Sequence, residues 1–258
     1  MLAFVDPVIM FSGVALPAAL AHLSPRLITL AEPKEAPGPE TAALPFGFEE
    51  LDEALPDHGL IRGGVVELAV SAGGLASTLA LGAVRAFQRQ QVATFGGAVK
   101  PWCAFVDPSS TLYAPGVAAS GVALDRMLVV RPPLEALGRV AIKLAESNVF
   151  ELVVIDTLGV LGAPVDFSLA RFGRVVRRLS MAVDGTPKSV LLLTDARVPR
   201  ALPLPVAQRI ELTRPAIDRV VVRVAKDRRG RISGPRSVAW TRGTVPAPRE
   251  VEHVRKLA

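Results

Sequence analysis

The residues best placed to do chemistry in this chain of 258 amino acids follow its first regular apolar run, Gly63–Val70. A loop that holds nucleotide phosphates has the pattern G-x-x-x-x-G-K-[ST], in which backbone N–H groups wrap the phosphates, the lysine neutralises their charge and the hydroxyl holds Mg²⁺. The stretch in that register is Val70, Ser71, Ala72, Gly73, Gly74, Leu75, Ala76 and Ser77. Leu75 and Ala76 replace the second glycine and the lysine, so only the hydroxyl of Ser77 survives. We expect neither tight ATP binding here nor a bound cofactor, although a helix N-terminus still attracts anions weakly.

A second candidate group is Asp156, which follows the apolar run Leu152–Ile155. Its carboxylate suits two roles, holding a metal ion through water or capping backbone N–H groups where the strand ends. The chain has three scattered histidines and a single cysteine. These residue types therefore predict no metal cluster, no serine hydrolase triad and no internal disulfide.

The elements that must position these groups alternate between strand and helix. The expected strands are Gly63–Val70, Cys103–Val106, Met127–Val130, Leu152–Ile155 and Val190–Thr194, and the expected helices are Ala76–Gln91, Leu134–Ser147 and Ser168–Val183. Strands that are apolar on both faces indicate a parallel sheet covered by helices. Two further strands, Ala207–Leu212 and Arg219–Ala225, have no helix between them and predict an antiparallel edge. The expected fold class is α/β, with a mostly parallel sheet flanked by helices.

Two stretches near the start of this core carry a more specific pattern. Residues 46–55 read FGFEELDEAL, and residues 59–68 read GLIRGGVVEL. A glycine, a Leu-Asp pair, a Gly-x-x-x-Gly turn and a strand containing glutamate resemble the beginning of a RecA-like core, and the likeness extends over roughly residues 44–226. The Leu55-Pro56 pair, the altered phosphate loop and the arginine-rich end are most similar to the ImuA branch, accessory proteins of damage-induced mutagenesis in bacteria.

The resemblance implies further positions of ATP chemistry. In RecA-like ATPases a glutamate that activates water stands two residues after the aspartate of the second strand, and here that residue is Ser109. A serine without a partner is not a general base near neutral pH. Asp156 matches the Walker B aspartate, whereas Thr194-Asp195 replaces the glutamine that senses the γ-phosphate. Because lysine, glutamate and glutamine are lost together, we expect a protein that is not an enzyme.

The resemblance also implies two DNA-lining loops, after Asp156 and after the strand that ends at Thr194. Both connections are short in this chain, so we do not expect DNA stretching of the RecA kind. The second contains Arg197 and Arg200. These two arginines are expected either to touch phosphate or to lie in a surface loop stiffened by prolines.

The net charge of +6 is concentrated towards the C-terminus. The basic run 226–231 is expected to form an exposed turn that contacts DNA phosphates or a protein partner. Helix Ser168–Val183 places three arginines on one face, which is either a solvated face or a docking strip. The candidate contact residues outside the loops are Arg171, Arg174, Arg178, Arg223, Lys226, Arg228, Arg229, Arg231 and Arg236. Aromatic residues make up only 5% of the chain, which argues against a protein that binds single strands mainly by base stacking.

The chain is expected to have three parts. Residues 1–40 form an apolar arm and a proline-rich linker, residues 41–240 the RecA-like core, and residues 241–258 a short amphipathic tail. The arm contains an uncharged run, Pro7–Pro25, but it lacks the basic start of a signal peptide and is interrupted by Pro17. We therefore expect a cytoplasmic protein with no membrane segment.

These observations favour a non-catalytic RecA-like adaptor in the bacterial DNA damage response. Its implied partners are RecA, an ImuB-type relative of Y-family polymerases and an error-prone replicative-type polymerase, with weak DNA binding. The alternative is an atypical DNA-stimulated ATPase or recombinase in which Ser77 and Asp156 share a metal ion. A third hypothesis is a protein that caps RecA filaments.

Overall fold

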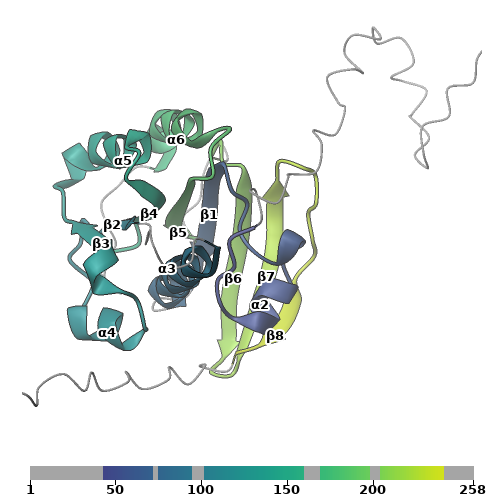
Figure 1. Ribbon diagram of the computed structural model, residues 1–258. Coiled ribbons are helices and arrows are strands. Elements are labelled where there is room, and N and C mark those ends of the chain that lie inside the picture. The colour runs from purple at the N-terminus through teal and green to yellow at the C-terminus, as the bar shows by residue number, and fades with distance from the viewer. Residues whose placement is uncertain (1–42, 72–74, 95–101, 160–168, 198–203, 241–258) are drawn as a thin grey trace, which may run out of the picture. The chain divides into compact units, whose positions relative to one another are not determined.

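The protein is described by a computed structural model that covers residues 43–71, 75–94, 102–159, 169–197 and 204–240. Within these ranges the chain forms a sheet of eight strands in the order β3-β2-β4-β5-β1-β6-β7-β8 (Figure 1). The arm and linker expected over residues 1–40 and the tail expected over residues 241–258 lie outside the described residues. None of the described helices combines the length and the apolar character needed to cross a bilayer.

Six strands run parallel to their neighbours, and two complete the sheet in antiparallel fashion. The strands are β1 Gly64–Val70, β2 Trp102–Val106, β3 Met127–Val130, β4 Phe150–Asp156, β5 Ser189–Asp195, β6 Gln208–Ala216, β7 Arg219–Asp227 and β8 Arg236–Ala239. The helices are α2 Glu49–Glu53, α3 Leu75–Thr94, α4 Ala114–Ala119, α5 Leu137–Glu146 and α6 Leu169–Val183. Short 3-10 turns span Pro56–His58, Leu124–Arg126 and Leu134–Ala136.

This architecture confirms the α/β class, the mostly parallel sheet and the antiparallel C-terminal strands. Three details differ from the sequence expectation. Strand β6 pairs in parallel with β1, so the antiparallel part begins at β7. The helix expected from Leu134 begins as a 3-10 turn after the extended residue Pro133 and becomes α-helical only at Leu137. Strand β8 and helices α2 and α4 were not expected, because none of these short segments has a clear hydrophobic period.

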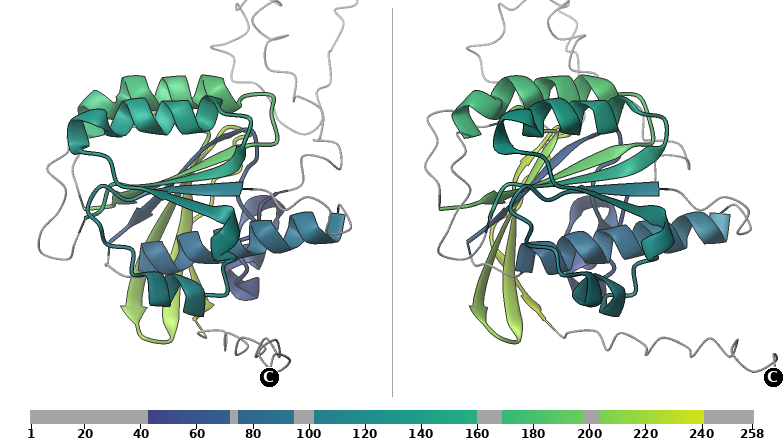
Figure 2. Two further views of the ribbon diagram at one scale, coloured as in Figure 1. Left: turned by 60° about the vertical axis from the view of Figure 1, so that its left-hand side comes forward. Right: turned by 90° about the vertical axis from the view of Figure 1, so that its left-hand side faces the viewer.

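The two faces of the sheet carry separate cores. Alternate residues of a strand point to opposite faces, so Val66 and Leu68 of β1 pack on the α3 side and Val65 packs on the side of α5 and α6. Figure 2 shows α5 and α6 side by side above the sheet and α3 below it. All seven residues of β1 are buried, as expected for a central strand covered on both faces.

Close helix packing depends on two glycines. A Cβ at Gly138 of α5 would approach Val175 Cγ2 of α6 to 2.8 Å, and a Cβ at Gly82 of α3 would come within 2.6 Å of the Phe46 carbonyl oxygen. Neither distance is tolerated by a real side chain without movement of the neighbour. Gly138 therefore lets α5 and α6 approach each other, and Gly82 lets the 43–48 segment lie against α3.

A buried carboxylate fixes the segment that leads into the core. Asp52 of α2 accepts three backbone N–H groups, those of Phe46 at 2.7 Å, Gly47 at 2.9 Å and Phe48 at 3.2 Å. Unpaired N–H groups in this buried corner would each cost free energy. Asp52 thus satisfies the backbone N–H groups of the segment that contains Phe46, a fully buried core residue.

The substitution Asp52→Ala is expected to lower the free energy of unfolding by about 2–4 kcal/mol, because three N–H groups lose their acceptor at once. Urea unfolding followed by circular dichroism measures this loss. The matched control is Glu53→Ala at an exposed position of the same helix, which should change the free energy by no more than about 0.5 kcal/mol. Equal stability of the two variants would contradict the role assigned to Asp52.

Candidate functional site

The end of β1, where a phosphate loop would begin, is tied to its neighbouring strands. The Ser71 N–H group donates to the Leu212 carbonyl of β6 at 3.1 Å, and the Ser71 hydroxyl donates to the same oxygen at 3.3 Å. The Val70 carbonyl accepts the Ala196 N–H group at 3.1 Å. These peptide groups extend the sheet pairing. Gly73 and Gly74 lie outside the described residues.

The first two residues of α3 face the hydrophobic core. Leu75 is 2% exposed and Ala76 is 1% exposed, and both belong to the cluster that packs α3 against the sheet. They occupy the positions of the glycine and the lysine in the phosphate-loop pattern. A lysine at that position would neutralise phosphate charge, whereas these side chains contribute apolar packing. Ser77, the surviving hydroxyl residue, is partly buried.

Asp156 ends β4 as a buried side chain. Its Oδ1 atom accepts the Leu158 N–H group at 2.9 Å, which is the strand-end capping interaction considered for this residue. The pKa of Asp156 is raised to about 6, mainly by burial and also by the negative charge of Asp107, while hydrogen bonds from Leu158 and Thr111 act in the opposite direction. The folded protein therefore stabilises the neutral carboxyl group more than water does.

The neighbouring carboxylate, Asp107, is the centre of a hydrogen-bond network that sequence reasoning did not identify. Asp107 is fully buried after β2 and accepts the Thr111 N–H at 2.8 Å, the Thr111 hydroxyl at 3.0 Å and the Leu112 N–H at 3.1 Å. Arg131 pairs with it through Nε at 3.4 Å. Ser109, at the position of the catalytic glutamate, is partly buried in the turn that begins at Asp107. The sequence signal for this network was the position of Asp107 directly after an apolar strand, because a carboxylate that is buried there needs hydrogen-bond partners.

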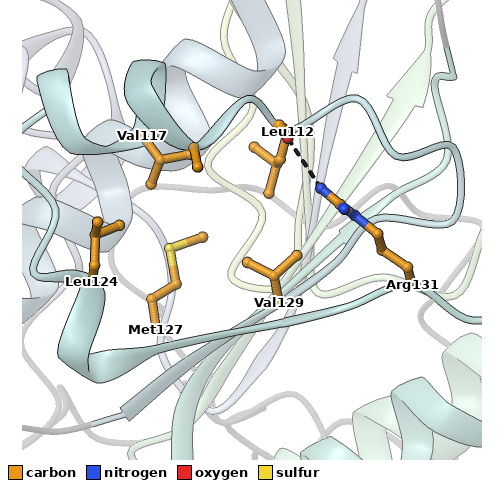
Figure 3. Close-up of a pocket in the computed structure, with 7 residues that line it drawn as sticks. Leu112, Val117, Leu124, Met127, Val129 and Arg131 are labelled. Atoms are coloured by element: carbon orange, nitrogen blue, oxygen red, sulfur yellow. Dashed lines mark hydrogen bonds between the residues drawn. The ribbon is translucent and has the colours of Figure 1, made fainter.

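A cavity of about 330 Å³ lies beside this network (Figure 3). It is mostly apolar and is lined by Leu112, Ala114, Val117, Leu124, Met127, Val129 and Arg131. The Arg131 Nη2 group donates to the Leu112 carbonyl oxygen at 3.1 Å across one wall. Because Asp107 binds both Leu112 and Arg131, it fixes the polar end of the cavity.

The cavity opens next to the free edge of the sheet. Strand β3 is the last strand on this side and pairs with β2 within the part of the chain that the structure describes. Two of its apolar side chains, Leu128 and Val129, are 38% and 39% exposed, and Leu124 of the preceding turn is exposed as well. An uncharged, exposed edge strand presents backbone groups and apolar side chains that can pair with another chain.

The basic run 226–231 is anchored to the protein by its own guanidinium groups. Arg228 donates to the carbonyl oxygens of Gly63 at 2.9 Å and Arg62 at 3.1 Å. Arg229 and Arg231 both bind the carboxylate of Asp57, at 2.9 and 2.5 Å. The turn is exposed, as expected, yet these three side chains anchor it to the segment that precedes β1.

The other predicted basic residues are spread over several surfaces. Arg174 and Arg178 are exposed on α6, where Arg178 lies 3.5 Å from Glu146, and Arg236 is exposed on β8. Three more have partners of their own: Arg197 pairs with Asp195 at 2.7 Å, Arg223 with Glu211 at 3.5 Å, and Lys226 donates to the Leu204 carbonyl at 3.3 Å. Arg200 and the side chain of Arg171 lie outside the described residues. The structure therefore does not gather the predicted basic residues into one site.

A buried ion pair joins three strands in the middle of the sheet. Glu67 of β1 accepts the Thr194 hydroxyl of β5 at 2.7 Å and pairs with Arg209 of β6 at 2.8 Å. Thr194 stands where the RecA-like pattern has its γ-phosphate-sensing glutamine, and its hydroxyl is used to bind Glu67. A glutamate within an otherwise apolar strand was the sequence signal for such a network.

The structure defines an α/β protein with a mostly parallel sheet, in which helix α3 begins with the buried residues Leu75 and Ala76. The comparisons point to the RecA-like superfamily. RecA of Salinispora tropica is 36% identical over 128 residues, which cover 49% of this chain and 34% of that protein. RecA of Lactococcus lactis is 32% identical over 175 residues, covering 63% and 43%, and RecA of Oceanobacillus iheyensis is 26% identical over 171 residues, covering 62% and 47%. The matches thus span less than half of each relative, and no protein-family model matches the chain.

The raised pKa of Asp156 predicts a specific pH dependence of stability. The folded pKa of about 6 lies above the ordinary 3.8, so Asp156 favours the folded state when protonated and this contribution is lost as the pH rises from about 4 to beyond 6. The difference corresponds to about 3 kcal/mol. The free energy of unfolding of Asp156→Asn, relative to the wild type, should therefore rise by about 2–3 kcal/mol over this interval.

Urea unfolding at several pH values measures this effect. The matched control is Asp184→Asn, an exposed carboxylate after α6, whose stability should stay parallel to that of the wild type. A parallel curve for Asp156→Asn as well would mean that Asp156 ionises without cost in the folded protein.

Proposed function

We propose that this protein is a non-catalytic RecA-like adaptor of the bacterial DNA damage response, similar to the ImuA proteins. The observation that carries the proposal is the burial of Leu75 and Ala76 in the core, where ATPases of this fold need a glycine and a lysine. The adaptor acts in the cytoplasm, with no cofactor. Its partners are RecA, an ImuB-type polymerase relative and an error-prone replicative-type polymerase.

The loss of ATP chemistry is supported at three separate places. The phosphate loop has no lysine to balance the triphosphate charge, and Leu75 fills space that the backbone of a phosphate loop needs. Ser109 cannot replace a glutamate as general base without a partner that takes its proton. Thr194 is engaged with Glu67, and the position of the γ-phosphate sensor is thus used for structure.

The adaptor binds its partner at the free edge of β3. An extended segment of the partner adds a strand to this edge and places a bulky apolar side chain in the adjoining cavity, a mode of recognition in which main-chain hydrogen bonds give affinity and a pocket gives specificity. Half-exposed Arg131 at the cavity wall favours an acidic group beside that apolar anchor. We assign this surface to RecA, which is the partner that the resemblance to the ImuA proteins implies.

The substitution Val129→Asp tests the assignment. It places a charge on the cavity wall at a half-exposed position, so it should lower affinity for RecA at least tenfold, about 1.4 kcal/mol, without unfolding the protein. Biolayer interferometry with immobilised full-length chain measures the affinity. Leu124→Asp, at another residue that lines the cavity, should have the same effect.

The control is Ile217→Asp, which adds the same charge at a residue 81% exposed in the turn between β6 and β7. It should bind RecA like the wild type. If Val129→Asp and Leu124→Asp bind RecA as tightly as this control, the β3 edge is not the docking surface. If the wild-type chain does not bind RecA, the adaptor role towards RecA is wrong.

A further inference from the structure

Helices α5 and α6 pack against the sheet and against each other, and their outer face is turned to solvent. Several of their apolar residues, among them Ala141 of α5 and Val176 of α6, are buried in the core on this side of the sheet. The contact between Gly138 and Val175 holds the two helices close together (Figure 2). Side chains on the outer face therefore project from backbone that is already ordered, so a ligand that binds there has to order only the side chains.

This outer face is strongly basic. Five exposed side chains, which we call the α5–α6 basic face, contribute its positive charge: Arg139, Lys143, Arg174, Arg177 and Arg178. Arg178 lies 3.5 Å from Glu146, an exposed pair of low strength. The side chains of the other four form no ion pair with another residue of the described ranges. The face thus keeps a clear excess of positive charge.

The spacing of these cations suits a chain of phosphates. Arg139 and Lys143 are four residues apart, as are Arg174 and Arg178, so the paired side chains start about 5–6 Å from each other along a helix. The two helices are separated by roughly 8–10 Å, as packed helices are. Arginine binds phosphate through a planar fork of donors, which gives two hydrogen bonds per contact.

The basic turn 226–231 is a weaker candidate for the same ligand. A phosphate that bound Arg229 and Arg231 would have to displace the carboxylate of Asp57, and Arg228 would have to leave two carbonyl groups. Each lost contact subtracts from the binding free energy. Among the described residues, no ion-pair partner of Arg139, Lys143, Arg174 or Arg177 would have to be displaced by a phosphate.

We infer that the α5–α6 basic face binds the phosphate backbone of nucleic acid without reading its sequence. A protein interface usually has an apolar centre. On the described part of these two helices, the large apolar side chains that are strongly exposed amount to Met181 alone, which is 78% exposed near the end of α6. Phe172, the aromatic residue of the two helices, is buried and cannot stack on a base. The inference rests on the proposed function in that an adaptor of DNA repair works on DNA.

The double substitution Arg174→Gln with Arg177→Gln, in the full chain, tests the inference. Binding of a fluorescent single-stranded oligothymidine is measured by anisotropy at a series of NaCl concentrations. Loss of two phosphate contacts should weaken binding about tenfold or more at low salt, and should reduce the slope of log K against log salt by about 1.4, since each contact on a single strand contributes about 0.7.

The matched control is Arg89→Gln with Arg219→Gln, which removes the same charge from exposed positions of α3 and β7. The control should keep the wild-type slope and most of the affinity. Thermal unfolding of both variants shows whether they remain folded. Equal losses in the two variants would mean that overall charge, and not the α5–α6 basic face, determines binding, and would overturn the inference.

Two further outcomes are decisive. Polyglutamate that displaces the oligonucleotide as effectively as unlabelled DNA of equal charge would assign the face to an acidic protein partner, and the inference would be wrong. Absence of DNA binding by the wild-type chain would also overturn it. Neither outcome affects the binding of RecA at the β3 edge, which lies on another part of the protein and is measured without DNA, so this failure is distinguishable from failure of the proposed function.

Discussion

The packing of the β1–α3 junction is the constraint on which the rest of the structure depends. Leu75 and Ala76 bury their side chains where α3 begins, and α3 in turn packs on one face of the sheet through residues such as Leu79. In a phosphate loop the same junction must leave the backbone open and present a lysine. Here the junction contributes apolar burial, which stabilises the fold without a nucleotide.

The acidic residues at the neighbouring carboxyl ends of β2 and β4 are also held by structural contacts. In ATPases of this fold, the acidic residues there would serve chemistry at the phosphates. In this protein Asp107 instead binds Thr111, Leu112 and Arg131, and through them it shapes the cavity beside β3. Asp156 caps the end of its strand. In the proposed adaptor, the carboxyl end of β2 thus supports the docking surface at the β3 edge.

Much of the fold could be predicted from the sequence, because a strand buried on both faces leaves a continuous apolar run such as Leu152–Ile155. The edge position of β3 could not be predicted from the sequence, because strand order depends on contacts between distant segments. For the same reason the sequence revealed the charge of Arg229 and Arg231 but not their partner Asp57, which is 172 residues from Arg229. The loss of the phosphate-loop lysine was readable directly, since it depends on residue identity alone.

Isothermal titration calorimetry of the full chain with Mg-ATP tests the central claim most directly, combined with phosphate release in the presence of single-stranded DNA and of RecA added separately. The account predicts no heat of binding and no release of phosphate by the chain. Micromolar binding of ATP, with turnover that is lost in Asp156→Ala, would contradict it. The protein would then be an atypical ATPase that binds the triphosphate despite Leu75 and Ala76.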